Sequence, residues 1–174
     1  TLLECCRKYG KIEKFIHVST DEVYGESMNE IDEKHKTEHS ILCPTNPYAA
    51  TKAGAELIAQ SYNHSFKMPI IITRGNNVYG PNQYPEKLIP KFLKLLYQGD
   101  KCTVHGEGNT RRNFIYVDDV SSAVETILFE GKIGEIYNIG TTDIIKIKDL
   151  AKKISKIFNT KIKFKNIKLN IGYV

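Results

Sequence analysis

The chain has 174 residues, 41% hydrophobic and 26% charged, which is typical of a globular protein with one core of ordinary size. Its apolar runs fall well short of the roughly 18 residues that cross a bilayer, so we expect no membrane association. The net charge of +5 is concentrated in residues 146–174, which hold nine lysines and one acid. Because these lysines are interleaved with apolar residues, they indicate a solvated face and not a nucleic-acid site.

The predicted elements alternate between strands and helices, starting with a helical pattern around Leu2, Leu3 and Cys6. Apolar runs predict strands at 14–19, 69–73, 102–105, 114–117, 136–139 and 161–165. Helical periodicity predicts helices at 47–66, 86–98, 118–130 and 146–158. The alternation favours an α/β fold, and the continuous β-branched character of the first two strands indicates a parallel sheet buried on both faces.

Individual residues predict where several of these helices begin or end. Pro47 is typical of the first turn of a helix, and Gln98-Gly99-Asp100 is expected to end the second predicted helix. Asp118 or Asp119 can cap the third helix. The polar stretch 26–46 is long enough for a loop that carries function.

Three polar side chains, Thr20, Asp21 and Glu22, directly follow the first predicted strand. In open α/β sheets ligands bind at the carboxyl ends of the strands. A hydroxyl and two adjacent carboxyl groups there have the chemistry of a proton-transfer site. In the alternative interpretation Asp21 caps a turn and Glu22 is a solvated acid, because acidic residues are common in turns.

Tyr48 and Lys52 lie four residues apart at the start of the first long predicted helix, so they share one helix face. A lysine ammonium beside a tyrosine hydroxyl stabilises the phenolate and makes tyrosine a usable base. The spacing alone is weak evidence, because Tyr97 and Lys101 match it too. That second pair straddles Gly99, so we expect it to share no helix face.

Cysteine and histidine usage indicates neither disulfides nor a metal. The four cysteines include the adjacent pair Cys5 and Cys6 and form no C-x-x-C motif, which favours reduced thiols in the cytoplasm. No signal peptide is visible at the start of the chain. His35 and His39 are four apart in a polar stretch without a third ligand, so we expect no metal site.

Several motifs occur in an order that resembles the extended short-chain dehydrogenase/reductase family, and within it the nucleotide-diphosphate-glucose 4,6-dehydratases of the dTDP-glucose type. The matching stretches are Ser19–Gly25, Asn46–Lys52, Asn77–Gln83, Pro85–Pro90, Gly106–Gly108, Arg112–Phe114 and Tyr137–Gly140. The Thr-Asp-Glu triplet distinguishes this group, since related epimerases usually lack the acidic pair and related decarboxylases usually carry Ser-Glu.

The resemblance implies the second half of a doubly wound parallel Rossmann-type sheet plus part of a smaller α/β substrate domain. Residues 1–74 would form the C-terminal half of an NAD-binding Rossmann domain. Residues 75–174 would form largely a nucleotide-sugar-binding domain, with 113–140 able to return to the Rossmann sheet. The implied cofactor is NAD, the implied substrate is a nucleotide sugar, and family members usually form homodimers.

The resemblance also implies a role for each site residue. Tyr48 takes the proton of the sugar 4-hydroxyl, Thr20 holds that hydroxyl, and Lys52 tunes Tyr48. Glu22 then removes the proton on C5 and Asp21 protonates the departing 6-hydroxyl, which gives a 4-keto-6-deoxy sugar. The residues implied in cofactor binding are Ser19, Tyr48, Lys52 and Asn77, and those implied in substrate binding are Asn77, Glu86, Lys87, Arg112 and Asn138.

One expected element of this family is missing, because no glycine-rich dinucleotide fingerprint occurs in the chain. By the family pattern we expect it in roughly 100 residues before Thr1, the size of the other half-domain. We therefore expect the isolated chain to be inactive and to bind NAD⁺ poorly. The alternatives are another nucleotide-sugar dehydratase, decarboxylase or epimerase of the family, or an inactive truncated relative that binds sugar nucleotides.

Overall fold

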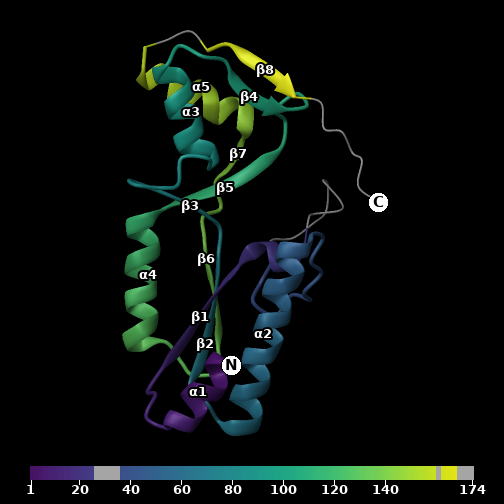
Figure 1. Cartoon of the computed structure of the whole chain (residues 1–174), viewed down its shortest axis with the longest axis vertical. Helices are drawn as coiled ribbons and strands as arrows, with labels where there is room; N and C mark the ends of the chain where they lie inside the picture. Colours follow the sequence, from purple (N-terminus) through teal and green to yellow (C-terminus); the bar gives the residue numbers. More distant parts are fainter. Residues whose placement is uncertain (26–35, 160–161, 168–174) are drawn as a thin grey trace. The chain divides into compact units, whose positions relative to one another are not determined.

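The computed structural model describes residues 1–25, 36–159 and 162–167, which form two compact units (Figure 1). Unit 1 comprises Thr1–Val78 and Val117–Gly140, and unit 2 comprises Tyr79–Tyr116 and Thr141–Val174. The elements of unit 1 are α1 (Leu2–Tyr9), β1 (Phe15–Thr20), the 3₁₀ helix η1 (Asp21–Tyr24), α2 (Pro47–Phe66), β2 (Ile70–Gly75), α4 (Val117–Glu130) and β6 (Ile136–Ile139). Those of unit 2 are α3 (Leu88–Tyr97), β4 (Cys102–His105), β5 (Arg111–Tyr116), β7 (Ile144–Lys146), α5 (Ile147–Ile157) and β8 (Phe164–Ile167), while β3 (Asn77–Tyr79) spans the boundary.

Unit 1 is built on a parallel sheet with the strand order β1–β2–β6. The central strand β2 pairs residue for residue with β1, from Phe15 opposite Ile70 to Thr20 opposite Gly75. Because the strands are parallel, their carboxyl ends lie at the same edge of the sheet. Thr20 is the last residue of β1, so η1 begins at this edge.

Helices cover the sheet of unit 1. Figure 1 shows α2 and α4 on opposite sides of the three strands, and α2 packs against β1, β2 and η1. Ala59 of α2 joins Met68, Ile70 and Ile72 in a buried apolar cluster, against which Phe15 packs. Burial of these side chains therefore holds α2 on the strands that carry the predicted catalytic residues.

Unit 2 has its own core. Helices α3 and α5 pack against each other and against β4, which pairs in parallel with β8. The strands β5 and β7 pair antiparallel. The buried cluster consists of Phe92, Leu96, Cys102, Val104, Ile147, Ala151 and Ile154. None of the helices in the described ranges is long and apolar enough to span a membrane.

The structure confirms the α/β class and the parallel sheet, and most predicted elements lie within three residues of their predicted ends. The predicted helix 47–66 coincides with α2, where Pro47 occupies the first turn. The capping role of Asp118 or Asp119 was wrong, because α4 begins at Val117 and both acids lie inside its first turn.

The short elements β3, β7 and η1 were not predicted. Residues 26–35 of the predicted loop and position 161 of the last predicted strand lie outside the described residues. The division into an NAD-binding part and a nucleotide-sugar-binding part stays a prediction.

The core of unit 2 depends on Phe92, which is fully buried on α3. We expect Phe92→Ala to lower the free energy of unfolding by about 3–5 kcal/mol, because it removes buried apolar surface and leaves a cavity. Tyr97→Ala on the same helix is the control, since Tyr97 is 83% exposed and its loss should change stability by less than about 0.5 kcal/mol. Urea unfolding of both variants measures the difference, and equal effects would contradict this assignment of the core.

Candidate active site

The predicted triplet lies at the end of β1 and in η1. Thr20 is the N-cap of η1, where its Oγ1 accepts a hydrogen bond from the Glu22 amide (3.3 Å) and donates one to Asp21 Oδ1 (3.3 Å). Thr20 is buried, Asp21 half-buried and Glu22 exposed. The cap of this turn is thus Thr20 and not Asp21, and the two adjacent carboxyl groups occupy different environments.

Burial raises the pKa of Asp21, because the charged form is less well solvated than in water. The hydrogen bond from Thr20 lowers this pKa, and the negative charge of Glu22 raises it further. The net effect keeps the Asp21 carboxyl protonated to a higher pH than a free aspartic acid. A carboxylic acid in this state can donate a proton.

The first turn of α2 is attached to this acidic turn through Asn46. Asn46 is the N-cap of α2, and its Oδ1 accepts a hydrogen bond from the Ala49 amide (2.8 Å). Its Nδ2 donates to Glu22 Oε2 (3.1 Å). Tyr48 lies in the same first turn, and the residue is 55% exposed. A single amide side chain therefore both starts the helix of Tyr48 and binds the carboxylate of Glu22.

Lys52 lies one turn further along α2, as predicted. Its Nζ donates a hydrogen bond to the Val18 carbonyl (2.7 Å), which places the ammonium beside β1, two residues before Thr20. The second pair with this spacing, Tyr97 and Lys101, does not share a helix, because α3 ends at Tyr97. The structure therefore confirms that only the first of these two pairs lies on one helix.

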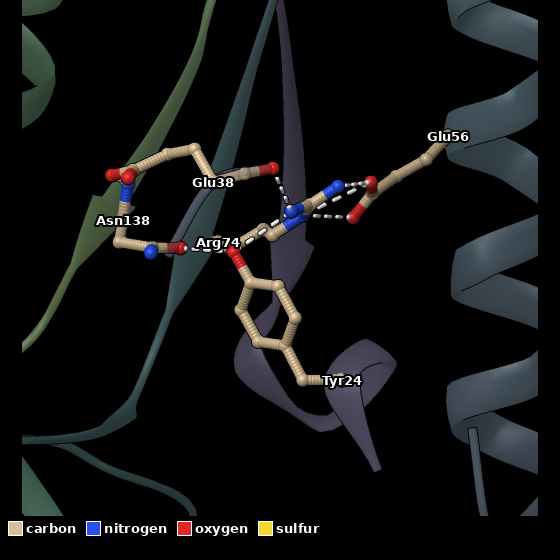
Figure 2. Close-up of polar contacts among 5 residues, drawn as sticks. All are labelled: Tyr24, Glu38, Glu56, Arg74 and Asn138. Carbon is tan, nitrogen blue, oxygen red and sulfur yellow. Dashed lines mark hydrogen bonds and ion pairs between the residues drawn. The ribbon is translucent and has the colours of Figure 1, made fainter. Parts of the chain in front are cut away.

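A buried ion pair joins β2 to α2 (Figure 2). Arg74 of β2 is 2% exposed and Glu56 of α2 is fully buried. Arg74 Nη2 donates to Glu56 Oε2 at 2.7 Å, and Arg74 Nε lies 3.1 and 3.2 Å from the two carboxylate oxygens. Burial alone would lower the pKa of Arg74, but the hydrogen bonds that Arg74 donates to Glu56 and Tyr24 raise it, and the net effect holds that pKa above its ordinary value.

The same guanidinium reaches η1 through Tyr24, as Figure 2 shows. Arg74 Nη1 donates to the Tyr24 hydroxyl (2.7 Å) and to the Glu38 carbonyl (3.1 Å). The Tyr24 hydroxyl donates in turn to Asn138 Oδ1 (2.7 Å), and the backbone N–H of Asn138 donates to the Glu38 carboxylate (2.9 Å). We call Tyr24, Glu38, Glu56, Arg74 and Asn138 the Arg74 network.

The structure places the remaining predicted residues in both units. Ser19 and Asn138 lie in unit 1 on the strands that flank Arg74, and Asn77 opens β3 in the same unit. Glu86, Lys87 and Arg112 are exposed residues of unit 2, with Lys87 directly before α3 and Arg112 in β5. Their roles in binding stay predictions.

Sequence reasoning missed Tyr24, Glu56 and Arg74. Two signals were available: Glu56 follows Lys52 at the spacing of one helical turn, and Arg74 directly follows the apolar run of β2. A charged residue so close to a buried strand needs a partner. Within the described ranges, no group of three or more His, Cys, Asp or Glu is placed to hold a metal ion, and His35 lies outside those ranges.

The environment of Asp21 predicts a pH dependence of stability. Because its folded pKa is raised from 3.8, the stability it contributes is present below that value and is lost as the pH rises through the folded pKa. The neutral variant Asp21→Asn avoids this loss, so its stability relative to the wild type should increase from about pH 4 to pH 7. Urea unfolding of both proteins across this range measures the difference, and a difference that stays constant or falls with pH would contradict the raised pKa.

Proteins of known function resemble this chain over most of its length. It is 55% identical to the dTDP-D-glucose 4,6-dehydratase of Dictyostelium discoideum over 163 residues, which are 90% of this chain and 37% of that protein. It is 52% identical over 159 residues to a trifunctional UDP-glucose 4,6-dehydratase/UDP-4-keto-6-deoxy-D-glucose 3,5-epimerase/UDP-4-keto-L-rhamnose-reductase of Arabidopsis thaliana, covering 91% of this chain and 24% of that protein. The chain thus spans well under half the length of these two relatives.

The fold agrees with these similarities. The crystal structure of dTDP-glucose 4,6-dehydratase from Bacillus anthracis in complex with NAD superimposes with a TM-score of 0.90 at 37% identity, covering 96% of this chain and 53% of that one. The profile of the NAD dependent epimerase/dehydratase family matches residues 1–140. On this match, which includes the triplet and the Tyr48–Lys52 helix, the chain belongs to the NAD dependent epimerase/dehydratase family.

Proposed function

We propose that the whole protein is a nucleotide-sugar 4,6-dehydratase, a lyase that converts dTDP-glucose to dTDP-4-keto-6-deoxyglucose. The observation that carries this proposal is the turn Thr20-Asp21-Glu22, in which the pKa of Asp21 is raised and Glu22 is hydrogen-bonded to the N-cap of the Tyr48 helix. Elimination of water needs a proton donor and a base side by side, and this turn supplies both. The relatives from Dictyostelium and Arabidopsis share the term 4,6-dehydratase in their names.

The residues beside the sheet edge fit an NAD molecule. Ser19 Oγ is buried and has no hydrogen-bond partner among the described residues, so a ligand group can satisfy it. Ser19, Tyr48, Lys52 and Asn77 are the residues that would hold the cofactor. When bound there, NAD⁺ would supply the hydride acceptor for oxidation at C4 and, once reduced, the hydride for C6.

Tyr48 and Thr20 act on the 4-hydroxyl. The exposed Tyr48 hydroxyl, in its phenolate form, takes the hydroxyl proton. The Thr20 hydroxyl can donate to the sugar oxygen, because its present bond to Asp21 is long for two oxygen atoms (3.3 Å). Lys52, held beside the strand end by the Val18 carbonyl, stabilises negative charge on Tyr48.

Asp21 and Glu22 carry out the elimination. A ketone at C4 acidifies the proton on C5, and the exposed Glu22 carboxylate removes it as general base. The 6-hydroxyl leaves as water after Asp21 protonates it, which requires the raised pKa of that carboxyl. Asn46 holds Glu22 in the orientation that this transfer needs.

Further residues would contact the nucleotide part of the substrate. Lys87 and Arg112 are exposed cations suited to the diphosphate, and an arginine can contact two phosphate oxygens at once. Asn77 would also contact the diphosphate, and Glu86 and Asn138 would contribute to binding the sugar or the base. The sequence identity of the chain to the dTDP-glucose dehydratase is close to its identity to the UDP-glucose dehydratase, so both nucleotide sugars are to be tested as substrates. We also propose a homodimer located in the cytoplasm.

The proposal is tested by incubating the whole protein and NAD⁺ with dTDP-glucose or UDP-glucose and identifying the product. We expect a 4-keto-6-deoxy sugar nucleotide. Asp21→Asn, Glu22→Gln and Tyr48→Phe should each lower kcat by about 10²–10⁴-fold, because each removes a general acid or base.

The matched control is Tyr97→Phe, which removes the hydroxyl of the other tyrosine with a lysine four residues later. Tyr97 is 83% exposed at the end of α3, so the control should keep the wild-type rate. A product epimerised at C4 and still carrying its 6-hydroxyl would contradict the proposed function, as would full activity of Asp21→Asn and Glu22→Gln.

A further inference from the structure

We propose that Arg74 is a positioning residue for the reaction: its buried guanidinium holds the acidic turn Asp21–Tyr24 and the helix of Tyr48 and Lys52 at a fixed separation. This inference rests on the proposed function for its catalytic consequence. Its structural content can be tested without any substrate. Arg74 itself is fully covered by protein, so the proposed role involves no contact with the sugar.

Arg74 is rigidly placed by the sheet. It is the penultimate residue of the central strand β2, with Ser19 of β1 and Asn138 of β6 as its paired neighbours. Thr20 follows Ser19 directly, so the backbone of Arg74 is in register with the end of the strand that delivers the triplet. The sheet thus fixes the backbone of Arg74, so contacts with its side chain can restrict the positions of α2 and η1.

One side of the guanidinium fixes α2. Glu56 follows Lys52 by four residues and Tyr48 by eight, so the three side chains lie along one helix face. The Nε and Nη2 atoms of Arg74 both donate to Glu56, at distances from 2.7 to 3.2 Å. Two donors on one carboxylate restrict the rotation and the axial position of the helix more than a single bond would. This contact therefore sets where Tyr48 and Lys52 point.

The other side of the guanidinium fixes η1. Tyr24 is its last residue, two positions after Glu22, and its hydroxyl accepts from Arg74 Nη1 (2.7 Å) while donating to Asn138 (2.7 Å). The guanidinium carbon also lies 4.8 Å from the centre of the Tyr24 ring. Figure 2 shows Tyr24 and Glu56 reaching Arg74 from the turn and from the helix. The bonds of the Thr20 side chain at the start of this turn are 3.3 Å long, and the contacts of Tyr24 add an anchor at its end.

The reaction makes this spacing important because both groups act on one sugar. Tyr48 must reach the 4-hydroxyl, while Glu22 and Asp21 must reach C5 and the 6-hydroxyl of the same molecule. Reacting atoms need to lie about 3–3.5 Å apart, and a misplacement of about 1 Å can slow a step by about 100-fold. Loss of the contact between Arg74 and Tyr24 should therefore first slow the elimination by Asp21 and Glu22. Loss of the contact between Arg74 and Glu56 should first slow the oxidation at C4, in which Tyr48 acts.

Tyr24→Phe in the whole protein is the decisive variant, because it removes only the hydroxyl and leaves Arg74 with both oxygens of Glu56. We expect kcat to fall roughly 10-fold with KM unchanged, the size of a lost hydrogen bond to a charged group. The slowed steps should be the proton transfers by Glu22 at C5 and by Asp21 at the 6-hydroxyl. The deuterium isotope effect on kcat from C5-labelled substrate should therefore rise, and that from C4-labelled substrate should fall.

Two further variants separate positioning from general destabilisation. Tyr137→Phe also removes a hydrogen-bonded tyrosine hydroxyl on β6, the acceptor of the Lys132 amide (3.0 Å), and it should leave both isotope effects unchanged. Glu56→Gln loosens the helix side, so its C4 isotope effect should rise instead. If Tyr24→Phe keeps the wild-type rate, or if the Tyr24 and Glu56 variants change both isotope effects alike, the positioning role is overturned.

Amide hydrogen exchange provides a readout without substrate. In Tyr24→Phe, exchange should become faster in Asp21–Gly25 and stay unchanged in the part of α2 around Lys52, whereas Glu56→Gln, which leaves the Arg74 charge uncompensated, should speed exchange most in that part of α2. If the wild-type protein converts neither dTDP-glucose nor UDP-glucose, the proposed function fails and hydrogen exchange alone decides the positioning claim. Unchanged exchange in both segments would overturn that claim whatever the activity.

Discussion

The structure of unit 1 depends on the buried ion pair between Arg74 and Glu56. Both side chains are almost completely removed from water, so each charge is tolerated only because the other is present. Removal of one partner from such a pair typically costs about 3–5 kcal/mol, because an uncompensated charge remains buried. The pair joins the central strand of the sheet to α2, and Tyr24 extends it to the turn after β1. One guanidinium thereby connects the elements that carry the predicted catalytic residues.

The acidic turn shows how neighbouring side chains of the same chemical type can take different roles. Asp21 and Glu22 are adjacent in the sequence, yet Asp21 is half-buried and Glu22 is exposed. Burial raises the pKa of Asp21, which favours the protonated form that a leaving hydroxyl needs. Glu22 is instead in contact with solvent, and its Oε2 accepts a hydrogen bond from Asn46 Nδ2 (3.1 Å). This local difference in solvation and hydrogen bonding supports the proposed division of roles, with Asp21 as the acid and Glu22 as the base.

Much of this arrangement could be predicted from local sequence signals. The helix α2 was predicted with its observed ends because Pro47 marks its first turn, and the triplet was located because it directly follows an apolar strand. The Arg74 network could not be predicted in this way, because its contacts join residues 18, 50 and 114 positions apart. Short-range periodicity carries no information on such pairings. The cap of α4 was misplaced for a local reason, since the helix begins one residue before the acids that were expected to cap it.

The central claim is that the two groups of side chains act in sequence on one sugar molecule, with the hydrogen from C4 returned at C6. The most direct measurement uses nucleotide-glucose carrying deuterium at C4, incubated with the whole protein and NAD⁺ and followed by NMR of the product. We expect the deuterium at C6 of a 4-keto-6-deoxy sugar, because the elimination by Asp21 and Glu22 comes between removal and return of the hydride. Deuterium retained at C4 of an epimerised sugar, or lost to the solvent, would contradict this account.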